Sequence, residues 1–197
     1  MAGVLVTLAA APAIAQDSRI GVAGTGTLVV KPLVEKKVSS LPEGALFWRV
    51  ETFDSVARAQ AAAGPTGLVA EVAGKVWLFT LGPAGGSSNG GTKEAEIGPL
   101  ARVSAPLYLL RVNEASGPPG SVSPVHTHPG AEAAYVLAGE QTFRTPHGVK
   151  RIAAGRADAG QPHTPMQVAS SGSENLHALV MFVVDATKPF SSPASLQ

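Results

Sequence analysis

The stretch PVHTHPGAEAAYVLAGE, residues 124–140, places two histidines one residue apart and a glutamate four residues after the second. These residues are His126, His128 and Glu132, in a chain with only five histidines among 197 residues. Side chains alternate faces along a β-strand, so the two imidazoles are predicted to lie side by side. Pro129 and Gly130 then reverse the chain and bring Glu132 to the same place. Two imidazoles and a carboxylate are a ligand set for Fe, Mn, Ni, Cu or Zn, so the stretch predicts a site for one divalent transition metal ion.

Short apolar runs surround this stretch at regular intervals, and turn residues rich in glycine and proline separate them. Such spacing is typical of an antiparallel β-sandwich or barrel, so we predict an all-β fold. The predicted strands in this half of the chain cover residues 105–112, 122–128, 131–138, 141–145, 149–152, 165–169 and 176–184.

The first half of the chain predicts further strands and one short helix. Residues 27–30 and 45–50 are β-like runs, and residues 68–72 and 75–81 read as a hairpin around Ala73-Gly74. In the hairpin, alternation places Trp77 and Phe79 on one face and Val76, Leu78 and Thr80 on the other.

The helix is predicted over residues 55–63, with Asp54 as its N-cap and Gly64-Pro65 as its stop signal. Residues 82–92, GPAGGSSNGGT, are rich in glycine but lack the Gly-Lys-Ser/Thr order of a phosphate-binding loop. We therefore interpret them as a flexible hairpin connection.

Composition and charge limit the classes of function. A length of 197 residues suits a single domain, and a formal net charge of +1 provides no basic field for nucleic acid, so we expect no nucleic-acid partner. The chain has no cysteine, which excludes thiolate ligands and a thiol nucleophile. It also lacks the Gly-x-Ser-x-Gly elbow of a serine hydrolase, so the composition argues against covalent hydrolysis.

The N-terminus suggests export. Residues 3–15 form an apolar run that ends in Ala13-Ile14-Ala15, a small-x-small pattern before polar Gln16 and Asp17. We predict a signal peptide over residues 1–15, cleaved after Ala15, and a periplasmic or secreted protein. The run is too short for a membrane span. No lysine or arginine precedes Arg19, so an ordinary apolar arm is the alternative.

The spacing from Gly120 through His126, His128 and Glu132 to Gly139 resembles the first motif of the cupin family at every defined position. The resemblance implies an antiparallel jelly-roll β-barrel that holds a metal near its axis, with Gly139 turning the chain between strands. It covers residues 98–188. Residues 16–97 are then an N-terminal extension, rich in strands, that packs on the barrel, and residues 189–197 are a C-terminal tail.

The second cupin motif is degraded in this chain. Counted from Gly155, Gln161 stands where the family has proline, His163 where it has glycine, Met166 where it has the metal-binding histidine, and Ser170 where it has asparagine. Three interpretations of the fourth ligand position remain open. Met166 fills the barrel as an apolar side chain, His163 replaces the missing histidine, or the Met166 sulfur binds the metal and favours copper.

The resemblance implies a function as well as a fold. It implies a metal-dependent dioxygenase or oxidoreductase that acts on a small organic substrate, similar to the quercetin-dioxygenase-like cupins, with Glu132 as the candidate catalytic base. The alternative is a non-catalytic periplasmic protein that binds a small ligand or a metal, and a cupin with an empty site is a third interpretation. Cupins commonly pair through sheet edges, so we also expect a homodimer.

Overall fold

The computed structural model describes residues 26–196, so the predicted signal peptide at residues 1–15 lies outside the described residues. All paired strands in this range are antiparallel, and one short helix accompanies them. The elements are β1 (Val29–Val38), β2 (Leu46–Phe53), α1 (Val56–Ala62), β3 (Gly67–Val72), β4 (Lys75–Gly82), β5 (Thr92–Leu100), β6 (Tyr108–Gly117), β7 (His126–Thr127), β8 (Gly130–Ala138), β9 (Glu140–Thr145), β10 (Gly148–Ala153), β11 (Ala157–Gly160), β12 (Gln167–Ser170), β13 (Leu176–Asp185) and β14 (Ser192–Pro193).

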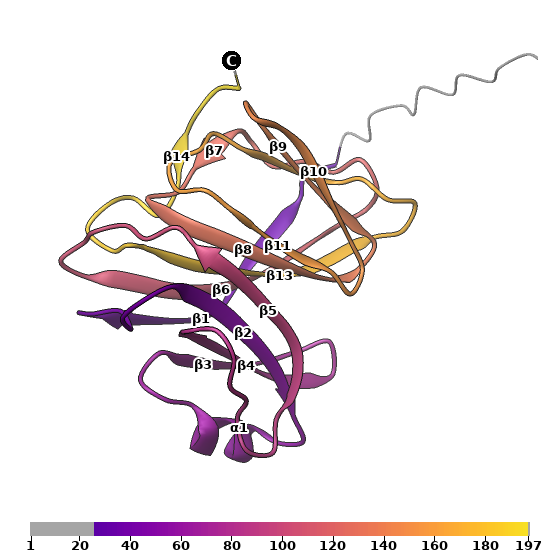
Figure 1. Ribbon diagram of the computed structural model, residues 1–197. Coiled ribbons are helices and arrows are strands. Elements are labelled where there is room, and N and C mark those ends of the chain that lie inside the picture. Colours follow the sequence, from indigo (N-terminus) through magenta and orange to yellow (C-terminus); the bar gives the residue numbers. More distant parts are fainter. Residues whose placement is uncertain (1–25, 197) are drawn as a thin grey trace, which may run out of the picture.

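The strands form stacked layers, as Figure 1 shows. The central layer is a five-stranded sheet in the order β1-β6-β13-β8-β11. A three-stranded sheet, β10-β9-β12, covers one of its faces, and a four-stranded sheet, β3-β4-β2-β5, covers the other. The central sheet and the three-stranded sheet form the first sandwich, and the small pair β14-β7 lies at its edge. The predicted all-β jelly-roll fold with one short helix is therefore confirmed.

Strands β6, β13 and β8 of the central sheet are largely buried on both faces, and the alternation along them divides their apolar residues between two cores. In β13, Val180 and Phe182 pack toward the three-stranded sheet, while Leu179 and Met181 pack toward the four-stranded sheet. Strand β8 alternates in the same way, with Ala134 and Val136 on the first face and Ala133 and Tyr135 on the second. A near-continuous apolar run is the expected sequence of a strand covered on both sides.

Aromatic side chains join the central sheet to the four-stranded sheet. Trp77 stacks on Phe79 at 6.3 Å between ring centroids and meets the edge of Tyr135 at 6.2 Å. The predicted face of the hairpin that carries Trp77 and Phe79 is thus the face that enters this core. Leu78 points the other way and packs with Ala59 of α1, so the alternation predicted for the β3-β4 hairpin is confirmed.

The predicted helix is present, but its N-cap is one residue later than expected. Ser55, not Asp54, occupies the cap, and its hydroxyl accepts a hydrogen bond from the Arg58 backbone N–H at 3.3 Å. Asp54 instead forms an exposed ion pair with the Arg58 guanidinium at 3.3 Å. Serine and aspartate are nearly equivalent as N-caps, so sequence alone ranks them poorly.

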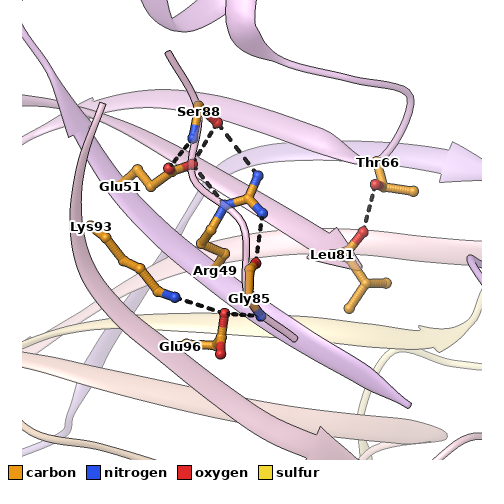
Figure 2. A network of polar contacts seen from close by, with 8 residues as sticks. All are labelled: Arg49, Glu51, Thr66, Leu81, Gly85, Ser88, Lys93 and Glu96. Atoms are coloured by element: carbon orange, nitrogen blue, oxygen red, sulfur yellow. Dashed lines mark hydrogen bonds and ion pairs between the residues drawn. The ribbon is translucent and has the colours of Figure 1, made fainter. Parts of the chain in front are cut away.

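The interpretation of residues 82–92 as a hairpin connection is wrong. Strands β4 and β5, which these residues join, both pair with β2 and lie on opposite sides of it. The connection runs along the length of β2, from Gly82 beside Phe47 to Thr92 beside Thr52, and polar contacts hold it there (Figure 2). Ser88 donates its N–H and its hydroxyl to the Glu51 carboxylate at 2.6 and 2.7 Å, and Arg49 donates its Nε to the same carboxylate at 3.0 Å.

Sequence patterns missed three strands, β5, β11 and the two-residue β14, and predicted another as too long. Strands β5 and β11 contain glycine, proline or alternating alanine, which weakens their apolar signal. Residues 122–125 are expected in a strand, but they lie outside β7, and among them Val122 forms isolated bridges to Thr27 and Ala169.

The predicted extension and tail both join the main fold. Strand β1, from the extension, pairs with β6 in the central sheet, and β14, from the tail, pairs with β7. The boundaries at residues 98 and 188 stay predictions.

Candidate metal centre

The short strand β7 fixes the position of His126. Its backbone N–H donates to the Met166 carbonyl at 2.9 Å, its carbonyl accepts from the Met166 N–H at 2.8 Å, and Pro193 of β14 pairs with it on the other side. The His126 Nδ1 lies 2.8 Å from the Pro124 carbonyl oxygen. A carbonyl oxygen only accepts, so Nδ1 carries the proton and Nε2 keeps a free lone pair.

A second carbonyl orients His128 in the same manner. The His128 Nδ1 donates to the Phe190 carbonyl at 2.6 Å, which leaves its Nε2 free as well. The His128 ring is almost fully buried between Phe182 and Phe190, each with its centroid 4.8 Å away. Hydrogen bonds from Nδ1 to a carbonyl are the arrangement by which proteins orient metal-binding histidines.

Glu132 approaches both imidazoles from β8. Its side chain is only 3 % exposed, and its Oε2 has no hydrogen-bond partner within the described part of the chain. Gly130 lets the start of β8 lie close to β13, because a Cβ at that position would be 2.1 Å from the Val183 carbonyl oxygen. Glycine is thus required two residues before the carboxylate.

The three side chains converge on one point. One ligand atom from each of His126, His128 and Glu132 lies within 4.8 Å of the others, and His128 Nε2 is 3.7 Å from Glu132 Oε2. That separation is too long for a hydrogen bond. It fits two ligands of one ion, each at about 2.0–2.2 Å from the metal. The sequence prediction that these residues come together is therefore met, and the donor set fits a transition metal.

Burial changes the protonation of both groups. Burial raises the pKa of Glu132 to about 8, since no charged partner compensates for the lost water. Burial, partly opposed by the hydrogen bond to Phe190, lowers the pKa of His128 to about 4, so this imidazole is neutral near pH 7. A cation at this point would bind the neutral imidazole and stabilise the deprotonated form of the Glu132 carboxyl group.

Met166 and His163, the two alternatives for a fourth ligand, are backbone neighbours of the two histidines. Met166 is 2 % exposed and packs in the apolar core of the first sandwich with Phe143 and Val168. His163 is exposed in a turn with φ of 57°, and its backbone N–H donates to the His128 carbonyl at 3.0 Å. Both residues therefore border the site through their backbones. The identity of a fourth ligand stays a prediction.

The remaining histidines are placed away from the cluster. His177 pairs with Glu114 at 2.7 Å, and His147 is exposed in the turn between β9 and β10. Arg144 and Arg151 are exposed, as their interpretation as outward residues requires.

A cavity of about 480 Å³ opens beside the cluster, and His126, His128 and Glu132 form part of its wall. Most of the remaining wall is apolar, and it includes Leu28, Val125, Val168, Val180, Phe182 and Phe190. Among the described residues, the wall includes neither lysine nor arginine, and neither Met166 nor His163. Such a cavity suits a small and largely apolar molecule.

Sequence analysis missed three residues of this site. Asn113 of β6 and Gln141 of β9 are buried polar residues on the cavity wall, and Phe190 lies in the predicted tail. Each amide lies two residues before an apolar residue of the same inward face, Asn113 before Ala115 and Gln141 before Phe143. A polar residue on the inward face of a strand is the signal that could have identified the two amides.

Comparison with solved structures finds partial similarity. The chain is similar to the DMSP lyase DddQ from Ruegeria pomeroyi, with 24 % identity over 43 % of this chain and 43 % of that one, at a TM-score of 0.38. It is similar to the polyketide cyclase RemF from Streptomyces resistomycificus, with 19 % identity over 45 % of this chain and 62 % of that one, at a TM-score of 0.38.

A cupin-like protein from Thermotoga maritima is also similar, with 15 % identity over 44 % of this chain and 65 % of that one, at a TM-score of 0.40. Cupin-like proteins are thus among the structures that resemble this chain, as its first motif predicts. In all three comparisons the match spans less than two thirds of the other protein. No family model and no curated protein matches the chain.

Within residues 26–196, the structure contains no helix with the length and apolar character needed to cross a membrane.

Proposed function

We propose that this protein is a metal-dependent enzyme that acts on a small, largely apolar organic molecule. His126, His128 and Glu132 hold the metal, and the cavity beside them holds the substrate. The observation that carries the proposal is the buried Glu132 Oε2, which has no hydrogen-bond partner among residues 26–196. It lies 3.7 Å from His128 Nε2, which the hydrogen bond of Nδ1 to Phe190 leaves free.

Each residue of the site has a defined task in this proposal. A divalent transition metal bound there would supply Lewis acidity or redox chemistry toward an oxygen atom. Pro124 and Phe190 hold the two histidines in the tautomer with a free Nε2. Phe182 and Phe190 exclude water from His128. Glu132 holds or releases a proton at Oε2 near neutral pH, which is the property of a general base when it is not bound to metal.

Oxidation of the substrate, as in the quercetin-dioxygenase-like cupins, stays the proposed reaction, because three protein ligands leave positions open for substrate and oxygen. The alternative is a protein that binds a small ligand or metal without catalysis. The apolar surroundings of Met166 favour that alternative, since they provide a packing residue where the family has a histidine.

Elemental analysis of the protein, purified without added metal or chelator, tests the proposal. We expect about one transition metal ion per chain in the wild type and loss of that ion in His126→Ala. Met166→Leu, which conserves volume, is the matched control and should keep the metal. Loss in Met166→Leu, with copper as the element, would assign the sulfur as a ligand. A wild type that binds none of Fe²⁺, Mn²⁺, Ni²⁺, Cu²⁺ or Zn²⁺ on titration would overturn the proposal.

Turnover separates the enzyme from the binding protein. Oxygen consumption and mass spectrometry of a bound organic molecule should show a product with the wild type and none with Glu132→Gln. If the organic molecule stays unchanged while metal occupies the site, the result would favour a protein that binds the molecule without catalysis.

We also propose that the protein is exported and that it forms a homodimer. N-terminal sequencing of protein from the periplasmic fraction should begin at Gln16, whereas intact residues 1–15 on cytoplasmic protein would contradict export. Sedimentation at micromolar concentration should give twice the mass of one chain.

A further inference from the structure

Two carboxamides on the cavity wall have no hydrogen-bond partner within the described part of the chain. Gln141 is 0 % exposed, and both its Nε2 and its Oε1 are without a partner. Asn113 is 3 % exposed, and its Oδ1 is without a partner. The two residues come from β6 and β9, which belong to sheets that face each other (Figure 1), and both residues line the cavity.

The register of the strands places Asn113 beside the metal centre rather than in it. Glu132 pairs with Phe182 across β8 and β13, whereas Asn113 pairs with Val180 across β6 and β13. Val180 is two residues from Phe182, so Asn113 belongs to the next inward-facing row of the central sheet. Gln141 lies on the opposite sheet, where it shares the inward face with Phe143.

Buried amides without partners are costly to a fold, so their retention on the wall of a cavity needs a cause. The other buried polar atoms without a partner include Trp48 Nε1, Thr80 Oγ1 and Ser170 Oγ, and none of these residues lines the cavity. The two amides differ from that group because a molecule in the cavity can reach them. Their available atoms include both a donor and acceptors.

We propose that Asn113 and Gln141 bind a neutral group of the substrate that both donates and accepts hydrogen bonds, such as a hydroxyl or an amide. Its class is an uncharged organic molecule with an apolar body, because the described wall carries no lysine or arginine and is largely apolar. The assignment rests on the proposed function only where it calls the bound molecule a substrate of the metal centre on the same cavity wall. The two amides set specificity and act as binding residues.

Binding of two matched probes tests this inference. Benzyl alcohol and ethylbenzene have nearly the same shape and differ by a hydroxyl in place of a methyl group. We expect the wild type to bind benzyl alcohol at least about tenfold more tightly, as measured by NMR titration, because a hydroxyl satisfies the amides and a methyl group leaves them without partners. Gln141→Met and Asn113→Leu, which nearly conserve size, should reduce the preference severalfold.

A control variant and a second measurement keep the test decisive. Ser170→Ala removes a buried hydroxyl without a partner that pairs with Gln141 across β9 and β12 but does not line the cavity, so it should keep the wild-type preference. Metal content is measured on the same samples. An equal preference in the wild type and both amide variants would overturn the inference, even with metal bound. A preference that depends on the amides, in a protein that also binds none of the five metal ions on titration, would support the inference and contradict the proposed function.

Discussion

Two buried glutamates in different regions of this molecule have opposite surroundings. Glu51, in the four-stranded sheet, is 0 % exposed and accepts hydrogen bonds from the Ser88 N–H, the Ser88 hydroxyl and the Arg49 guanidinium (Figure 2). Glu132, in the central sheet, is equally buried, but its Oε2 has no partner in the described protein. The fold itself supplies the hydrogen-bond partners of the Glu51 carboxylate, whereas the Glu132 Oε2 would gain a partner only from a bound ligand.

The pKa values of the two carboxyl groups follow their partners. Burial alone raises the pKa of Glu51, but the hydrogen bonds from Ser88 and Arg49 outweigh burial and lower it below its ordinary value. Burial acts without opposition at Glu132 and raises its pKa to about 8. Burial of a carboxylate is therefore not by itself a sign of function, whereas burial without partners points to a ligand.

The largest expected effect is the loss of stability in Glu51→Gln. The amide places a donor against the donors of Ser88 and Arg49, so we expect the free energy of unfolding to fall by about 2–4 kcal/mol. Glu132→Gln in metal-free protein should change it by less than about 1 kcal/mol, because that carboxyl is already neutral at pH 7 and has no partner to lose. Urea denaturation of both variants in EDTA measures the difference, and equal losses would remove the contrast between the two sites.

The next largest expected effect is stabilisation by added metal, and it should require Glu132 but not Glu51. A ligand at a hundredfold excess over its Kd stabilises the native state by about 2.7 kcal/mol. We expect a rise in the melting temperature of the wild type and of Glu51→Gln on addition of the bound metal, and no rise for Glu132→Gln. A rise of equal size in Glu132→Gln would show that the metal binds elsewhere.

Acid should weaken the fold through Glu51 by less than the substitution does. Its folded pKa lies below the unfolded value of 4.5, so its contribution is complete above that value and is lost as pH falls through the folded pKa. The wild type should therefore lose stability on acidification below about pH 4.5, and Glu51→Gln should lose less. Denaturant midpoints measured from pH 6 to pH 3 report the two slopes, and parallel curves would exclude Glu51 as the cause.

The smallest expected effect is that of Ser88→Ala, which removes one of the donors to Glu51 and keeps the backbone N–H. We expect a loss of about 1–2 kcal/mol in the free energy of unfolding. The neighbouring Ser87→Ala is the control and should lie within about 0.5 kcal/mol of the wild type. A control that falls as far as Ser88→Ala would attribute the loss to the loop rather than to the hydrogen bond.

The part of the site that could be predicted from the sequence consists of residues that lie close together along the chain. His126, His128 and Glu132 lie within a few residues, and strand alternation is enough to bring them together. Asn113 and Gln141 lie on strands whose pairing depends on the whole fold, so their approach to the site could not be predicted from spacing. The contact between Glu51 and Ser88 could not be predicted either, because Ser88 lies in a glycine-rich segment whose sequence indicates a flexible connection.

Because the inner strands of the central sheet are buried on both faces, ligand preference and stability depend on different residues of the same strand. Along β13, Val180 and Phe182 line the cavity, while Leu179 and Met181 pack against the four-stranded sheet. Directed evolution can therefore vary every second position of one strand to search for new ligand preferences. The intervening residues stay unchanged and keep the fold stable, so the fold tolerates a wider range of cavity shapes.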